Sequence, residues 1–236
     1  MIWGGDISLD HGAVVDLRAD GELEWAGYVA SAQSAVHGWP WGEGVWFPRA
    51  QLKKHMPDPH GFNLMRLAWW AAILADWHRT RNPVYVAVED YAMSARSNST
   101  YQIGEQGGLF RWLAWVNGAA VRLHDNGSVK KFAAHHGGAD AQQVVDAVAD
   151  RWWPELRDVA HKQSREDLGA AYAVARLYWT ELMVRRGDLS VADLEPPERQ
   201  IFHRVTDYQP LNLLSRSLIC ADAELPAAVM PPPFQP

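Results

Sequence analysis

Apolar residues gather in three short runs among the first thirty residues. These runs predict three short strands, at residues 2–9, 12–17 and 23–30. An Asp-Gly pair at Asp20 separates the second strand from the third, and such a pair favours a tight hairpin turn. We therefore expect an antiparallel meander, followed over residues 37–61 by a loop rich in Gly, Pro and His.

Further along the chain, helical periodicity alternates with short apolar runs. The predicted helices are residues 62–79, 102–117, 139–153 and 164–185, and the predicted extended segments are residues 84–88, 119–123 and 129–133. Residues 84–88 are apolar throughout, as expected for a strand that is buried on both faces. This order predicts an α/β fold with a mixed five-stranded sheet, an antiparallel meander followed by parallel strands, and helices on both faces.

The composition changes near residue 187, and the chain ends in a Pro-rich stretch. We expect one domain over residues 1–186 and a C-terminal extension over residues 187–236 that is partly extended or disordered. The 236 residues, 48% of them hydrophobic, are enough for one substantial core.

Cysteine usage and charge narrow the class of protein. Cys220 is the only cysteine, so neither an internal disulfide nor a zinc site built on several thiolates can form. The sequence shows neither a signal peptide nor an apolar run long enough to cross a membrane, so we expect a cytoplasmic protein. The net charge of −6 counts against nucleic-acid binding, although a cluster of functional carboxylates would itself lower the total.

Three acidic residues stand where a carboxylate costs free energy. Asp6 lies within the first predicted strand, Glu89 directly follows an apolar strand, and Asp167 begins an Ala-rich helix. If they converged, they would repel one another unless a divalent cation lay between them. Mg²⁺ prefers oxygen ligands, and a pair of such ions roughly 4 Å apart hydrolyses phosphodiesters.

Each acid also has a plain interpretation. Asp6 could bind its own loop, and Glu89 could be a strand end that meets solvent beside Asp90. Asp167 fits a capping motif that begins at Ser164, in which the acid complements the helix N-terminus. The order of the three acids along the chain is more specific than any one of them.

That order resembles the RuvC family of Holliday junction resolvases, which belong to the RNase H-like nucleases. Four segments carry the resemblance, which covers about residues 1–180: Val86–Met93, Asn98–Leu109, Ser128–Phe132 and Glu166–Ala175. It implies an RNase H-like fold and a homodimer that makes paired cuts in branched DNA, above all in four-way junctions. It also implies Asp6, Glu89 and Asp167 as catalytic metal ligands for two Mg²⁺ ions per site, with Mn²⁺ able to substitute.

The chain departs from the family pattern at several positions. The family usually has an acid or a His three residues before the last Asp, where this chain has Ser164. Glu166, His161 or Ser164 itself stays open as a further ligand. Many members have Gly where Ser8 stands. We interpret these differences as signs of a divergent member, for which an origin in a phage-infected cell is one explanation.

Two polar segments supply the predicted DNA contacts. Their residues are Arg96, Ser97, Asn98, Lys130 and Lys131 for phosphates, and Tyr91 and Tyr101 for stacking on bases or wedging between them. The alternatives are a solvated turn, partly buried tyrosines and a solvated strand edge. We interpret His135 and His136 as part of a turn or a DNA-facing loop, because adjacent side chains on an extended chain point in opposite directions.

Three other functions stay open. The first is a broader branched-DNA nuclease or an RNA-directed RNase H-like nuclease acting on RNA–DNA hybrids or ribosomal RNA precursors. The second is an actin-like or sugar-kinase ATPase, although residues 7–11 lack a Gly/Thr-rich phosphate turn and the chain is too short for two such halves. The third is a catalytically inactive DNA-binding homologue, which the net charge and Ser164 favour.

Overall fold

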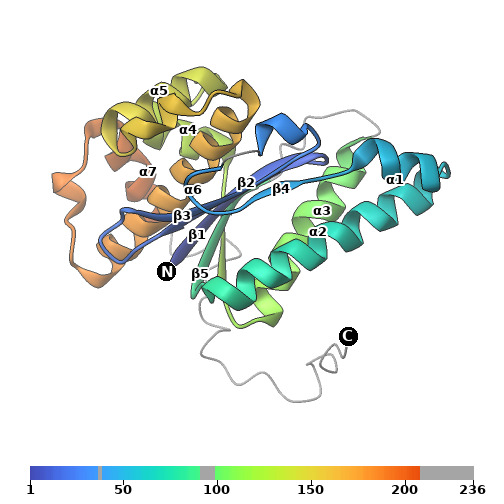
Figure 1. Cartoon of the computed structure of the whole chain (residues 1–236). Helices are drawn as coiled ribbons and strands as arrows, with labels where there is room; N and C mark the ends of the chain where they lie inside the picture. Colours follow the sequence, from blue (N-terminus) through green and yellow to red (C-terminus); the bar gives the residue numbers. More distant parts are fainter. Residues whose placement is uncertain (37–38, 91–98, 208–236) are drawn as a thin grey trace, which may run out of the picture.

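The computed structural model of the chain describes residues 1–36, 39–90 and 99–207 (Figure 1). The strands are β1 (Ile2–Ile7), β2 (His11–Leu17), β3 (Leu23–Ala30), β4 (Gly44–Trp46), β5 (Tyr85–Glu89) and β6 (Ala120–His124). The α-helices are α1 (Arg49–His55), α2 (Pro59–Arg81), α3 (Ser99–Val116), α4 (Asn126–Ala134), α5 (Ala141–Arg151), α6 (Lys162–Arg186) and α7 (Pro196–Asp207). Short 3-10 turns are η1 (Gln33–Ala35), η2 (Pro154–Asp158) and η3 (Val191–Asp193).

The strands form one mixed sheet in the order β4-β3-β2-β1-β5-β6. The antiparallel meander β1–β3 is confirmed, as is the parallel pairing of β5 with β1 and of β6 with β5. The sheet has six strands where the sequence predicted five, because the short strand β4 pairs in parallel with β3.

Two local predictions are wrong. Residues 37–61, expected to be a loop, contain β4 and α1, which are too short for their periodicity to emerge among Gly and Pro. Residues 129–133, expected to be extended, lie in α4, where the Asp125 side chain caps the helix by accepting from the Ser128 amide. Val129 and Phe132 share the buried side of α4, which is helical spacing.

Each face of the sheet carries its own core, as the predicted α/β fold requires. Helices α4, α5, α6 and α7 cover one face, here called the α6 face, and α2 and α3 cover the other (Figure 1). None of the helices in the described part of the chain is both long and apolar enough to cross a membrane.

Two glycines in β1 allow helices to approach the strand closely from opposite faces. A Cβ at Gly4 would lie 2.1 Å from the Ala171 carbonyl oxygen of α6, and one at Gly5 would lie 2.6 Å from the Phe110 ring of α3. The glycines that weaken β1 as a strand by sequence are therefore required by packing. The same close approach brings the first turns of α6 near the next residue, Asp6.

The chain beyond residue 186 packs on α4 and α5. Ile201 and Phe202 of α7 are buried in the core of the α6 face. Arg151 of α5 forms an ion pair with Glu198 and donates to the carbonyl oxygens at the end of α4. At least the first part of the predicted extension, up to residue 202, thus belongs to the same core as the sheet.

Candidate active site

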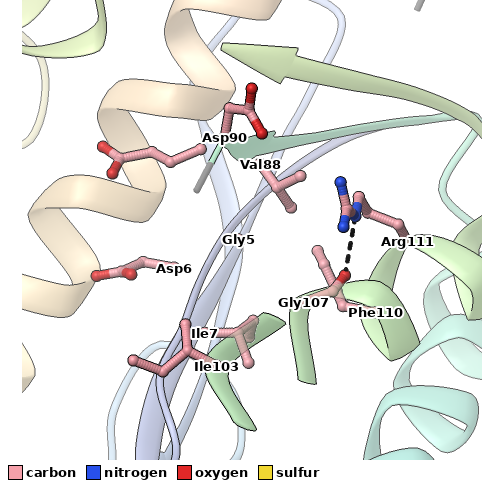
Figure 2. Close-up of a pocket in the computed structure, with 10 residues that line it drawn as sticks. Gly5, Asp6, Ile7, Val88, Asp90, Ile103, Gly107, Phe110 and Arg111 are labelled. Atoms are coloured by element: carbon pink, nitrogen blue, oxygen red, sulfur yellow. Dashed lines mark hydrogen bonds between the residues drawn. The ribbon is translucent and has the colours of Figure 1, made fainter. Parts of the chain in front are cut away.

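Asp6 and Glu89 lie side by side where the parallel strands β1 and β5 end. The register pairs Gly5 with Val88, so the next pair along the two strands is Asp6 and Glu89. Neighbouring strands are about 4.8 Å apart, and the alternation of side chains sends both carboxylates to the α6 face. Figure 2 shows Asp6 pointing toward α6 and away from Phe110 and Arg111 of α3.

Asp167 enters the same region from the second turn of α6. Its side chain is buried and accepts hydrogen bonds from His11 Nδ1 at 2.7 Å, Tyr28 Oη at 3.1 Å and Gln163 Nε2 at 2.8 Å. The bond to Asp167 is the main reason why the pKa of His11 is raised. Strands β2 and β3 and the first turn of α6 together hold this carboxylate in place.

The electrostatics of the site are those of crowded carboxylates. Burial raises the pKa of Asp6 well above its usual range, and the charges of Asp167 and Glu89 raise it further. Burial also raises the pKa of Glu89, although the Asn126 side chain donates to it at 2.6 Å and Lys130 lies close enough to oppose the shift. Both of the other predicted acids therefore act on Asp6.

A divalent cation would fit the Asp6–Glu89 pair. In the part of the chain that the structure describes, no hydrogen bond or ion pair stabilises the Asp6 carboxylate, so a cation would offset its burial and its repulsion by its neighbours. Across the same residues, no group of three His, Cys, Asp or Glu side chains is arranged to hold one ion. Asp167 accepts from three donors and Glu89 from one, whereas Asp6 accepts from none of the described residues, so Asp6 and Glu89 have more acceptor capacity left for a metal than Asp167.

Three residues near the start of α6 were left open as a further metal ligand: His161, Ser164 and Glu166. The helix begins at Lys162 with His161 at its N-cap, so the interpretation of Ser164 as a cap is wrong. Ser164 is buried, with its hydroxyl 3.4 Å from His161 Nδ1, and the Glu166 carboxylate lies 3.6 Å from Lys162 Nζ.

Of the predicted DNA contacts, four lie outside the described residues: Tyr91, Arg96, Ser97 and Asn98. Tyr101, in the first turn of α3, is 82% exposed, so it is not a partly buried core residue. Lys130 lies near Glu89, whereas Lys131 donates to Gln200 of α7. Lys130 is thus the predicted basic residue that the structure brings to the carboxylates.

A cavity of about 170 Å³ opens on the α3 side of the same strand ends (Figure 2). It is lined by Gly5, Asp6, Ile7, Val88, Glu89, Asp90, Ile103, Gly107, Phe110 and Arg111. The Arg111 guanidinium is directed by a bond from Nε to the Gly107 carbonyl oxygen. The carboxylates therefore lie at the border between this cavity and the α6 face.

Sequence reasoning did not identify the residues that hold the carboxylates. They are His11, Tyr28, Gln163 and Asn126. Gln163 lies one helical turn before Asp167, and that spacing could have suggested it. The contacts of His11 and Tyr28 depend on how α6 crosses the sheet, which no local pattern records.

Comparisons with known proteins identify the fold. Neither a protein-family model nor a curated protein matches the chain. Among solved structures, it is similar to Thermus thermophilus RuvC in complex with a Holliday junction substrate, with 19% identity, a TM-score of 0.53, and coverage of 79% of this chain and 95% of that one. A second structure of Thermus thermophilus RuvC matches with 19% identity and a TM-score of 0.48, covering 79% of this chain and 96% of that one.

The chain has a RuvC-like fold. The RNase H-like fold expected from the order of the acids is therefore confirmed, with a sixth strand at the edge of the sheet. At this level of identity the likeness concerns the fold, and the activity has to be argued from the site.

Proposed function

We propose that this chain is a metal-dependent, structure-specific DNA endonuclease that hydrolyses phosphodiesters at four-way junctions. The observation that carries the proposal is the paired Asp6 and Glu89 at the ends of β1 and β5, with Asp167 opposite them on α6. Their position on a RuvC-like fold supports branched DNA as the substrate, since the similar Thermus thermophilus protein has been solved with a Holliday junction.

Asp6 and Glu89 would hold Mg²⁺, or Mn²⁺ in its place, with two ions in each active site. The ions supply an activated nucleophile at neutral pH and stabilise charge on the phosphate. The chain's own residues fix the geometry: Asn126 orients Glu89, and His11 and Tyr28 orient Asp167. Hydrolysis would leave 5′-phosphate and 3′-hydroxyl ends.

Basic residues near the carboxylates would position the DNA. Lys130 lies close enough to Glu89 to affect its pKa and would meet the phosphates beside the scissile one. Tyr101 is exposed in the first turn of α3 and would stack on a base at the crossover. Two strands must be cut at a junction, so we propose a homodimer with two such sites.

The decisive experiment compares cleavage of a labelled four-way junction with that of a linear duplex, a flap, a three-way branch and an RNA–DNA hybrid, in Mg²⁺ and in Mn²⁺. Paired symmetric nicks in the four-way junction alone are expected. Asp6→Asn should abolish cleavage and leave junction binding intact. Cleavage at the parental rate by that variant would overturn the assignment of the site.

The other outcomes separate the alternative functions. Equal cutting of several branched substrates would indicate a broader branched-DNA nuclease, and cutting of the hybrid alone would indicate an RNA-directed enzyme. Junction binding without cleavage in either metal would indicate an inactive homologue, for which Ser164 in place of an acid or His is a reason.

A further inference from the structure

Helix α1 carries a concentration of positive charge that contrasts with the rest of the chain. Residues 44–57 include Arg49, Lys53 and Lys54 and no acidic residue, although the whole chain has a net charge of −6. All three side chains are exposed. Within the described residues, neither lysine has an acidic partner, so their charges face solvent.

The first residue of α1 is tied to the candidate active site. Arg49 Nη1 lies 2.7 Å from Asp10 Oδ2, in the turn between β1 and β2. The next residue, His11, donates to Asp167. Two contacts therefore connect α1 to the carboxylates.

The body of α1 is fixed rather than loosely attached. Leu52 is partly buried and packs against the core between the sheet and α2. Lys53 follows Arg49 by one helical turn, so the two lie on the same side of α1, about 6 Å apart along its axis. The exposed charges thus form a short row that leads away from the carboxylates.

We propose that α1 is a second DNA-binding surface, at which Arg49, Lys53 and Lys54 contact the phosphate backbone of the arm that leaves the cleavage site on the β1–β2 side. Lys130 would contact the phosphate backbone on the β5–β6 side. A row of exposed cations that begins at the site and leads outward suits a polyanion that passes through the site. The inference rests on the proposed function and adds to it a contact that the predicted DNA-binding residues did not include.

The test is junction binding by the full chain in the Asp6→Asn background, which keeps the DNA intact. Fluorescence anisotropy with a labelled four-way junction is measured between about 50 and 200 mM salt for Lys53→Ala/Lys54→Ala. The matched control is Arg18→Ala/Arg79→Ala, which also removes two exposed charges. Both arginines lie at the opposite end of the sheet, where β2 and α2 end.

The lysine variant is expected to bind the junction roughly tenfold more weakly at about 50 mM salt. The slope of log K against log salt should also become shallower by about 1.8, because each phosphate that a lysine neutralises contributes about 0.9. The control should stay within about twofold of the parent. If both variants bound the junction with the same affinity and the same salt slope, the role of α1 would be overturned and the proposed function would stand. If the Asp6→Asn protein itself did not bind DNA, both the role of α1 and the proposed function would be overturned.

Discussion

The Asp6 carboxylate is buried beside two other acidic side chains, which disfavours its charged form. Because its folded pKa lies above the ordinary value, the folded chain binds its proton more tightly than the unfolded chain does. Its contribution to stability is therefore fully present below about pH 4 and is lost as the pH rises through the folded pKa. Without a cation, the carboxylate destabilises the fold at neutral and alkaline pH.

Asp6→Asn should consequently stabilise the metal-free protein at pH 8 and do so much less at pH 5, because the cost of the buried charge grows as the pH rises above the ordinary pKa of Asp. Urea denaturation in EDTA at the two pH values measures this difference. Asp76→Asn, on an exposed residue that pairs with Arg79, is the control and should change stability by less than about 0.5 kcal/mol. A less stable Asp6→Asn at pH 8 would mean that the carboxylate makes a structural bond.

His11 offers a second prediction, about positioning. Its Nδ1–H donates to Asp167 at 2.7 Å, and residues that orient a functional carboxylate typically contribute about 10–100-fold to activity or metal affinity. His11→Ala should lower the single-turnover cleavage rate by about that factor, with little change in the affinity for the junction. His60→Ala, on an exposed histidine of α2, is the control. Loss of DNA affinity with an unchanged cleavage rate would instead make His11 a DNA contact.

The acidic residues of the candidate site could be predicted from the sequence, whereas the residues that bind them could not. Asp6 and Glu89 follow from local signals, since each is a carboxylate in or directly after an apolar strand. His11 and Tyr28 lie 156 and 139 residues from Asp167 in the chain. These two residues contact Asp167 only because α6 crosses the sheet, so no pattern along the sequence could predict the contacts.

At the scale of elements, the packing of β1 between α6 and α3 sets the position of the site. Gly4→Ala would place a Cβ 2.1 Å from the Ala171 carbonyl oxygen, so α6 or β1 must shift. We expect a loss of about 3 kcal/mol or more in the free energy of unfolding. Gly108→Ala is the control, because on α3 an added Cβ meets nothing within 4 Å and alanine favours a helix. Denaturant titration of both variants measures the contrast, and equal stabilities would disprove the close approach.

Which elements the sequence predicted follows from their length and regularity. Strands β1 to β3 were found because each is an apolar-rich run of six to eight residues. Strand β4 has three residues and α1 has seven, too few for a period to stand out among Gly and Pro. Helix α4 was missed because Asp125, Asn126 and Gly127 resemble a turn, although Asp125 is the helix cap.

For the whole molecule, the question is where the folded unit ends. The change of composition near residue 187 suggested a boundary there, yet α7 packs on α4 through Phe202, which is fully buried. Its ring meets that of Phe132, with 6.3 Å between the ring centres, and Glu198 pairs with Arg151. Because Asn126 at the start of α4 orients Glu89, the support of α7 extends to the site.

Phe202→Ala should therefore destabilise the entire domain by about 3–4 kcal/mol, in a single cooperative transition. Urea unfolding followed by tryptophan fluorescence and by far-UV circular dichroism tests this, and the two signals should coincide. If α7 were an appendage to a domain ending at residue 186, the midpoint of the main transition would stay unchanged and a separate early transition would appear. If instead the midpoints of both signals fell together, residues 191–202 would belong to the same folding unit as the sheet. The loss of a local contact lowers global stability only when that contact is part of the unit that unfolds cooperatively.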